Sequence, residues 1–189
     1  MKRDFFREVS LFCYNEVMIN SDELLFSVDE SNSPIDPRPR ALSHQTGIWH
    51  RSCHVWIINH KREILCQQRS LLKDSNPGRW EPFFGGHLAP GQEYMANAIS
   101  ELEEELGLDV NPSQLHFFEE YKYSKGTEFQ GVFILEWNGD LNTLKLEEDE
   151  VQRVEWRSID EVERLVVREK SERWTLIGYE EKLLNQLRK

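Results

Sequence analysis

Three glutamates, Glu101, Glu104 and Glu105, stand within five residues of one another near the middle of the chain. On a helix, which turns about 100° per residue, their side chains lie within about 100° of one another and apart from the apolar stripe. No basic residue stands three or four positions from any of them in that stretch, so their charges destabilise the helix unless a cation neutralises them. Because Mg²⁺ prefers oxygen ligands and bridges carboxylates to phosphates, the spacing indicates a divalent-cation site. A solvated acidic face is the alternative.

Glycines and a proline flank this predicted helix, about Glu93 to Leu106. The pair Gly85 and Gly86 lets a ligand approach the backbone closely. Pro90 and Gly91 then make a tight turn, and Gly107 suits a helix C-terminus. The glutamates and glycines together therefore favour a site that binds a ligand over a solvated surface.

The stretch from Gly86 to Leu108 resembles the Nudix box. That pattern reads glycine, five free positions, glutamate, seven free positions, arginine, glutamate, an apolar residue, a free position, two glutamates, a free position, glycine and an apolar residue. The matching residues are Gly86, Glu101, Leu102, Glu104, Glu105, Gly107 and Leu108. Two positions differ, because Gln92 replaces the first glutamate and Ser100 replaces the arginine.

The resemblance implies an α/β/α sandwich that hydrolyses a diphosphate linked to another group, with the help of a metal. It implies that Glu101, Glu104 and Glu105 are catalytic and hold Mg²⁺ or Mn²⁺, with backbone ligands from the Gly86 region. Gly85 and Gly86 are then also expected to contact the substrate. A bound metal activates water and neutralises charge on the pyrophosphate oxygens. One of the three glutamates, or Glu128, is expected to deprotonate the water.

Segments outside the box resemble the Nudix subgroup related to isopentenyl-diphosphate isomerase, over most of residues 24 to 160. These segments are "LLFSVDESNSP", "HQTGIWHRSCHVWIIN", "ILCQQRS" and "KDSNPGRWEPFFGGH". The isomerase has its catalytic cysteine directly before the Gly-His pair, where this chain has Gly85. The resemblance also implies a second metal site from His50, His87 and Glu128, with His44 offset by about one residue. Histidines that only form structural hydrogen bonds are the alternative.

Further candidates lie around the box. Arg69 and Arg79 bracket the loop before it and could bind substrate phosphate through the forked guanidinium, although exposed arginines are common. The acidic run at residues 147–150 could supply a general base, but a solvated turn is favoured. Aromatic residues beside the strands could wall a pocket, but core packing is favoured. They are Trp49, Trp56, Trp80, Phe83 and Phe84.

Strand and helix patterns mix along the chain without strict alternation, which predicts an α/β fold with a mixed sheet and helices on both faces. Strands are expected at residues 52–59 and 63–69, as a hairpin, and at 115–124, 128–139 and 150–158. Residues 29–47, with three prolines, are expected to form a connector. Ser158 is expected to cap a helix to about residue 169, and residues 173–187 to form a last helix.

Length and composition allow one domain of residues 24–189 behind an N-terminal extension of residues 1–23, with residues 50–160 as its Nudix core. No apolar run approaches the roughly 20 residues of a membrane span, and no export signal is recognised. The three cysteines lack metal or redox spacing, which fits the cytoplasm. The net charge of −11 argues against a nucleic-acid polymer as the ligand. A homodimer stays open.

The preferred function is therefore a Mg²⁺-dependent hydrolase of a nucleoside diphosphate or another small diphosphate-linked molecule. A non-catalytic Nudix-fold binding module is the alternative, because Gln92 cannot act as an anionic ligand or base and Ser100 carries no charge. The isomerase is a third hypothesis, weakened by Gly85.

Overall fold

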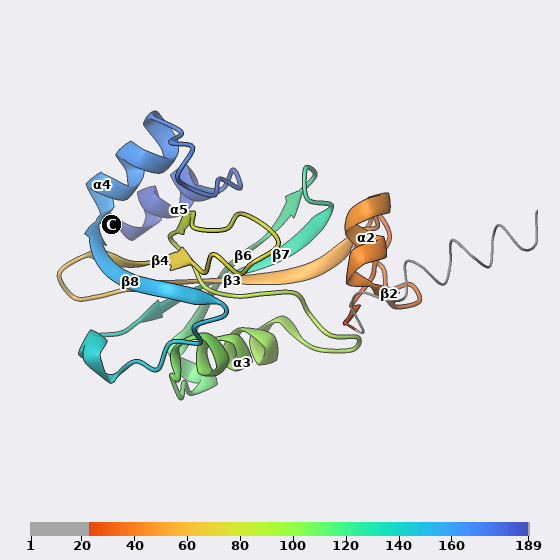
Figure 1. The fold of residues 1–189 in the computed structure, drawn as a ribbon, viewed down its shortest axis with the longest axis horizontal. Helices are drawn as coiled ribbons and strands as arrows, with labels where there is room; N and C mark the ends of the chain where they lie inside the picture. The colour runs from red at the N-terminus through yellow and green to blue at the C-terminus, as the bar shows by residue number, and fades with distance from the viewer. Residues whose placement is uncertain (1–22, 189) are drawn as a thin grey trace, which may run out of the picture.

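The computed structural model describes residues 23–188, so residues 1–22 of the predicted extension, including Cys13, lie outside the described residues. Its helices and strands follow one another along the chain from orange to blue in Figure 1. In order they are β1 (Leu24–Leu25), β2 (Arg38–Pro39), α2 (Arg40–Thr46), β3 (His50–Ile58), β4 (Glu63–Arg69), β5 (Trp80–Glu81), α3 (Tyr94–Leu106), η1 (Pro112–Gln114), β6 (Leu115–Tyr123), β7 (Glu128–Glu136), η2 (Leu141–Thr143), β8 (Val151–Ser158), α4 (Ile159–Glu163), η3 (Arg164–Arg168) and α5 (Glu180–Leu187).

The main sheet is mixed, as predicted. Its strand order is β5-β4-β3-β7-β6, and β8 pairs with β4. Only the β3–β7 pair is parallel. The predicted hairpin of β3 and β4 is antiparallel, but the two strands pair only at Ile58 and Ile64. Away from that point, β3 is bridged by the segment before α3, with Ser52 opposite His87 and Val55 opposite Phe84.

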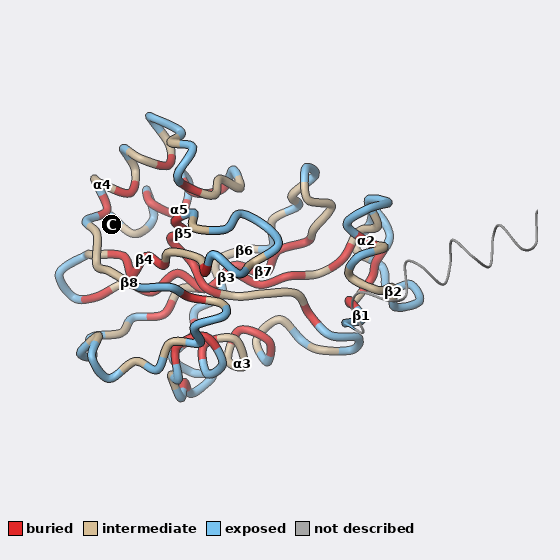
Figure 2. Tube along the Cα trace, viewed as in Figure 1, coloured by how far each residue is buried: buried red, intermediate tan, exposed pale blue. Residues whose placement is uncertain are grey.

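Helices cover both faces of the sheet, as the sequence predicts. Helix α3 lies on one side and α4 and α5 lie on the other (Figure 1). The first core packs Leu102 and Leu106 of α3 against Val55 and Phe133. The second packs Leu183 and Leu184 of α5 with other residues around Trp56. Figure 2 shows the buried residues concentrated along the central strands between these layers.

The connector predicted for residues 29–47 was wrong in its second half, where α2 forms. The prolines all precede the helix, and Pro39 is its N-cap. A proline at a helix start removes no helical hydrogen bond and presets φ. Gly47 ends the helix with a left-handed backbone conformation, φ 71°. The helix matters for function because it carries His44.

The C-terminal predictions were partly correct. The Ser158 side chain accepts a hydrogen bond from the Glu161 backbone N–H and so caps α4, as predicted. The last helix begins at Glu180, later than predicted, since Gly178 at φ 131° interrupts regular structure before it. Within residues 23–188, no helix is long and apolar enough to cross a membrane.

Candidate active site

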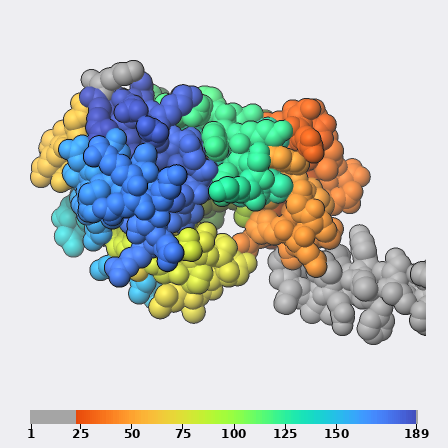
Figure 3. Space-filling view, turned by 90° about the horizontal axis from the view of Figure 1, so that it is seen from above, coloured from red at the N-terminus to blue at the C-terminus, as the bar shows by residue number. Residues whose placement is uncertain are grey.

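Most of the predicted site residues meet at a cavity of about 670 Å³. It opens between the loop after β4, the N-terminal part around α2 and the β6–β7 hairpin, where the surface is visibly hollowed in Figure 3. Glu101, Glu104 and Glu105 line one part of it, and His87 and Glu128 line another. The cavity is therefore lined by members of both groups that the sequence suggested separately, the acidic group and the histidine-rich group.

The three predicted site glutamates of α3 differ in their exposure. Glu104 is exposed, Glu101 is half-buried and Glu105 is buried. The Glu105 carboxylate accepts a hydrogen bond from the Gly85 backbone N–H at 3.2 Å. The Asn97 side-chain amide lies 3.5 Å from the Glu101 carboxylate. The cluster is therefore built into the protein rather than spread over a solvated helix face.

Burial and mutual repulsion make these carboxylates hard to ionise. Burial, together with the charges of Glu104 and Glu150, raises the pKa of Glu101 to about 7. Burial, with the charges of Glu101 and Glu81, raises the pKa of Glu105 well above its usual range. Such shifts arise where carboxylates share a low-dielectric site without a compensating cation. A divalent ion would reverse them, so the donor set fits Mg²⁺ or Mn²⁺.

Two glycines allow this arrangement. A Cβ atom on Gly86 would lie 2.4 Å from Glu101 Oε1, so a side chain there would displace that carboxylate. Gly85 has φ 137°, and a Cβ there would lie 2.2 Å from the Cys53 carbonyl oxygen. The isomerase's cysteine therefore cannot occupy position 85 in this conformation. The Gly86 oxygen accepts from the Cys53 N–H at 2.9 Å and the Asn97 amide at 3.4 Å, and its role as a metal ligand stays a prediction.

The two residues that depart from the box have structural partners. The Ser100 hydroxyl donates to Glu104 Oε1 at 3.2 Å. The Gln92 side-chain oxygen accepts from the Ala89 backbone N–H at 2.9 Å, which stabilises the turn before α3. Gln92 does not line the cavity. Its replacement of glutamate therefore leaves the described carboxylate cluster intact.

The two predicted arginines have different positions. Arg69 lines the cavity, but its guanidinium is paired with Glu81 at 3.1 Å and also donates to the Ser75 carbonyl. Arg79 is exposed and is not among the residues that line the cavity. Sequence reasoning missed Lys73, which lines the cavity and pairs with Glu150.

Carboxylates from distant parts of the chain join the cluster. Glu147 and Glu150 line the cavity. Glu147 is exposed, in agreement with the favoured solvated turn, whereas half-buried Glu150 pairs with Lys73. Val151 starts β8, whose pairing with β4 brings the turn beside the loop that carries Lys73. Glu81 of β5 is also buried in the cavity wall. The prediction missed Glu81 because its position depends on pairing between strands.

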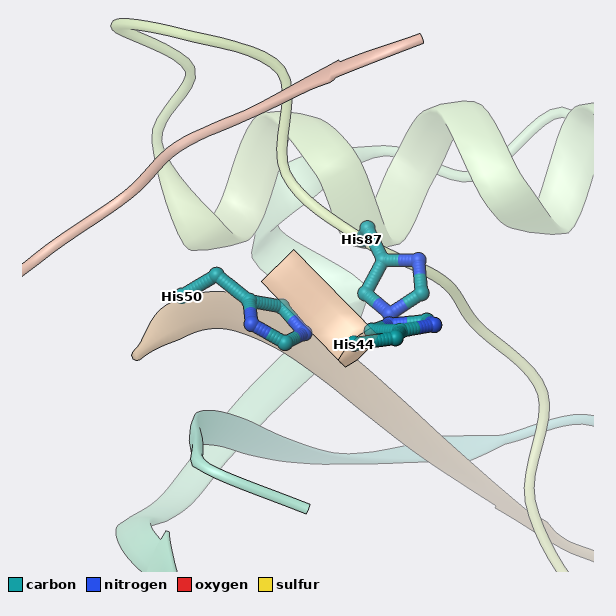
Figure 4. A group of neighbouring side chains, drawn as sticks. All are labelled: His44, His50 and His87. Carbon is teal, nitrogen blue, oxygen red and sulfur yellow. The ribbon is translucent and has the colours of Figure 1, made fainter. Parts of the chain in front are cut away.

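The histidine group is compact. The potential ligand atoms of His44, His50 and His87 all lie within 4.8 Å of one another, and Figure 4 shows the three rings facing each other. The His50 Nδ1 bonds the Ile48 carbonyl at 2.9 Å. Because a carbonyl only accepts, Nδ1 carries the proton and Nε2 keeps a lone pair. That Nε2 is buried and has no partner among the described residues.

Two of the histidines, His44 and His87, stay neutral, as metal ligands must. Burial lowers the pKa of His87 to about 3 and also lowers the pKa of His44. Glu128 receives a hydrogen bond from the Ser52 hydroxyl at 2.6 Å. Burial opposes its ionisation, but the hydrogen bonds from Ser52 and Gln130 help to lower its pKa overall. The three histidines therefore fit a second metal site, which exposed His44 joins from α2, and a ligand role for Glu128 stays a prediction.

Comparison with known proteins agrees with this geometry. The family model described as "NUDIX domain" matches residues 49–176. An uncharacterised Nudix hydrolase of Clostridium acetobutylicum is 30% identical over 154 residues, which cover 77% of this chain and 74% of that protein. An isopentenyl-diphosphate isomerase of Streptomyces avermitilis is 34% identical over 116 residues, which cover 61% of this chain and 58% of that protein.

A solved structure shares the fold. It is the protein DR0079 from Deinococcus radiodurans, with a TM-score of 0.70 and 18% identity, and the match covers 88% of this chain and all of that one. The family match spans the acidic helix, β3, β7 and most of the residues that line the cavity. The chain belongs to the NUDIX domain family.

Proposed function

We propose that the protein is a Mg²⁺- or Mn²⁺-dependent hydrolase that cleaves the pyrophosphate bond of a nucleoside diphosphate or another small diphosphate-linked molecule. The observation that carries this proposal is the gathering of carboxylates around one cavity, with Glu81 and Glu105 buried in its wall. These carboxylates are Glu81, Glu101, Glu104, Glu105, Glu147 and Glu150. The three basic side chains that also line the cavity, Arg40, Arg69 and Lys73, are too few to balance their charge. A polyanionic substrate would need further positive charge to enter.

Glu101, Glu104 and Glu105 would hold the divalent ion. When bound, the ion supplies neutralisation of the pyrophosphate charge and activation of water. The half-buried carboxylate of Glu101 has a pKa of about 7 in the metal-free chain. A base with a pKa near the working pH transfers protons efficiently, although an ion beside it would lower that pKa.

The chain's own groups then have separate tasks. A glutamate of the box, or Glu128, takes the proton of the attacking water, whose oxygen forms a bond to one phosphorus. The bond between that phosphorus and the bridging oxygen breaks, and the proton ends on the released phosphate. Lys73 contacts the phosphate if it leaves Glu150, and Arg69 mainly holds Glu81 in place. The histidine group with Glu128 is proposed as a second metal site.

The rival functions have less support. The binding-module hypothesis rested on Gln92 and Ser100, but Gln92 holds a turn outside the cavity and Ser100 bonds to Glu104. Neither residue removes a carboxylate from the cluster. The isomerase hypothesis draws support from relatives with that name. This protein, however, lacks the isomerase's catalytic cysteine, and the backbone at Gly85 leaves no space for one.

The test is product release from a panel of nucleoside diphosphates and other diphosphate conjugates, with Mg²⁺. The Glu104→Gln variant is compared with Glu103→Gln, a matched control on the same helix that is exposed and outside the cavity lining. A fall in turnover of about 10- to 100-fold or more in Glu104→Gln alone supports the proposal. Losing a residue that only contacts a metal ligand already lowers activity by about that factor. No turnover, or equal rates in both variants, contradicts it.

A further inference from the structure

A chain of three buried side chains ends at the cavity. Trp56 Nε1 donates to the Tyr179 hydroxyl at 3.1 Å, and that hydroxyl lies 2.7 Å from His54 Nδ1. His54 and Tyr179 are 7% and 2% exposed. The His54 ring stacks on Phe83, with centroids 3.9 Å apart. The other edge of the ring belongs to the cavity wall, since His54 lines the cavity and Tyr179 does not.

This chain fixes which ring nitrogen carries the proton. Trp56 Nε1 can only donate, so the Tyr179 oxygen accepts from it. If His54 Nδ1 also donated to that oxygen, the phenol proton would have no acceptor among the described residues. An unmet buried donor is costly, so the Tyr179 hydroxyl donates to Nδ1. Burial lowers the pKa of His54 to about 4, so the ring is neutral and its proton is on Nε2.

The His54 Nε2–H has no acceptor within the part of the chain that the structure describes; the ring's hydrogen bond is made by Nδ1. This neutral N–H in the cavity wall is therefore available to donate to an acceptor on a ligand. Ser52, two positions before His54 on β3, already donates its hydroxyl proton to Glu128, whereas the His54 Nε2–H has no such partner among the described residues. His54 is thus separate from the histidine group and lies further along the strand.

Gln130 of β7 offers the complementary group. It pairs with Ser52 in the parallel register and so faces the same side of the sheet as His54. Its amide nitrogen donates to Glu128 Oε2 at 3.1 Å, which orients the amide because a carboxylate only accepts. The remaining Gln130 oxygen is buried and has no partner among residues 23–188. Both residues line the cavity.

We propose that His54 and Gln130 form a specificity subsite for a polar organic group of the substrate. His54 Nε2–H donates to a neutral acceptor on that group, and the Gln130 oxygen accepts from a donor on it, above the apolar ring of Phe83. A pure hydrocarbon group, such as an isopentenyl tail, would leave both atoms unmet. The inference rests on the proposed function only for its choice of diphosphates as ligands.

Two substitutions separate the two ends of the His54 ring. In His54→Asn, the amide reaches only as far as Nδ1, so it can still accept from Tyr179 but presents nothing to the cavity. In His54→Gln, the longer side chain can present an N–H near the place of Nε2. The first variant therefore removes the proposed donor, and the second is the conservative replacement that should restore part of it.

Binding is measured by calorimetry with Mg²⁺. The probes are the α,β-methylene analogues of ADP and UDP, whose bridges resist hydrolysis, and isopentenyl diphosphate. The tighter nucleotide analogue is expected to bind at least about 10-fold more tightly than isopentenyl diphosphate. His54→Asn should weaken the binding of that analogue by about 5- to 100-fold, which is the effect of one unsatisfied buried polar group. The affinity for isopentenyl diphosphate should not change. His54→Gln should recover part of the loss.

Nitrogen NMR of histidine-labelled wild-type protein tests the tautomer without any variant. A proton on His54 Nε2 supports the inference. A proton on Nδ1, no binding of either nucleotide analogue, isopentenyl diphosphate binding at least as tightly, or equal losses for both ligand classes in His54→Asn overturns it. Because these readouts need no turnover, an inactive protein that shows the expected binding would refute the proposed hydrolase and leave the subsite standing.

Discussion

Replacing Glu101 with glutamine should stabilise the metal-free protein at alkaline pH. Glu101 is held between burial and the negative charges of Glu104 and Glu150, which raise its pKa from 4.5 to about 7. A group with a raised carboxyl pKa contributes most stability below its unfolded pKa and loses it as the pH rises through the folded pKa. The wild-type protein therefore loses this contribution between about pH 4.5 and 7, and Glu101→Gln does not.

The size of the effect follows from that pKa. A rise from 4.5 to about 7 corresponds to about 3 kcal/mol, at about 1.4 kcal/mol for each pH unit. Since the side chain is partly exposed, solvent screening reduces the value to about 1 to 3 kcal/mol. Glutamine has nearly the same shape and can still accept from the Asn97 amide, so little packing is lost.

The assay is urea unfolding with EDTA at pH 5 and pH 8. The free energy of unfolding of Glu101→Gln should match that of wild type within about 1 kcal/mol at pH 5 and exceed it by about 1 to 3 kcal/mol at pH 8. Glu103→Gln, on the exposed face of the same helix, should show no such pH-dependent difference. A variant less stable than wild type at pH 8, or an equal difference at both pH values, would refute the reasoning.

Three further predictions concern the same cavity. The rise in melting temperature caused by Mg²⁺ should be larger at pH 8 than at pH 5, because Mg²⁺ binds ionised carboxylates and Glu101 becomes ionised near pH 7; scanning fluorimetry measures it, and a larger rise at pH 5 contradicts it. Gly85→Cys should lower stability by several kcal/mol in thermal unfolding, since its Cβ would meet the Cys53 carbonyl. Gly91→Ala, with open space around it, is the control, and equal losses would remove the steric argument. His50→Ala should weaken Zn²⁺ or Mn²⁺ binding at the histidine group, measured by calorimetry, whereas exposed His60→Ala should not; equal affinities in the two variants count against the second site.

The sequence predicted the parts of the fold that depend on local pattern. Apolar spacing and Gly107 placed α3 within one residue of its observed bounds, and alternation located the strands. The sequence pattern does not predict helix α2, because three prolines within one segment disfavour a helix there. The prolines lie before its first turn, where they are compatible with a helix.

The site divides in the same way. Glu101, Glu104 and Glu105 are neighbours on one helix, so their spacing alone brought them together. Strand pairing and loops bring Glu81, Lys73 and Glu150 to the cavity. The local periodicity of the sequence does not predict such long-range contacts. The bond between His54 and Tyr179 spans 125 positions of the chain, so neither residue stood out before the fold was known.

The same limit applies to burial. The helical wheel put Glu105 with its two neighbours, but it is buried against Gly85. Its depth depends on the segment that crosses β3, because Ser52 and Val55 fix the path of Gly85 and Gly86. A carboxylate can therefore be assigned to a helix face from sequence, whereas its pKa depends on contacts made across the fold.

The central claim is that the carboxylate cluster works with a divalent cation to split a diphosphate. The most direct measurement is the initial rate of product release as Mg²⁺ is titrated into EDTA-treated protein, with the diphosphates of the panel as substrates. The account predicts no rate in EDTA and a saturable rise with Mg²⁺ for at least one substrate. A rate that is the same with and without Mg²⁺, or no release from any diphosphate at saturating Mg²⁺, would contradict it.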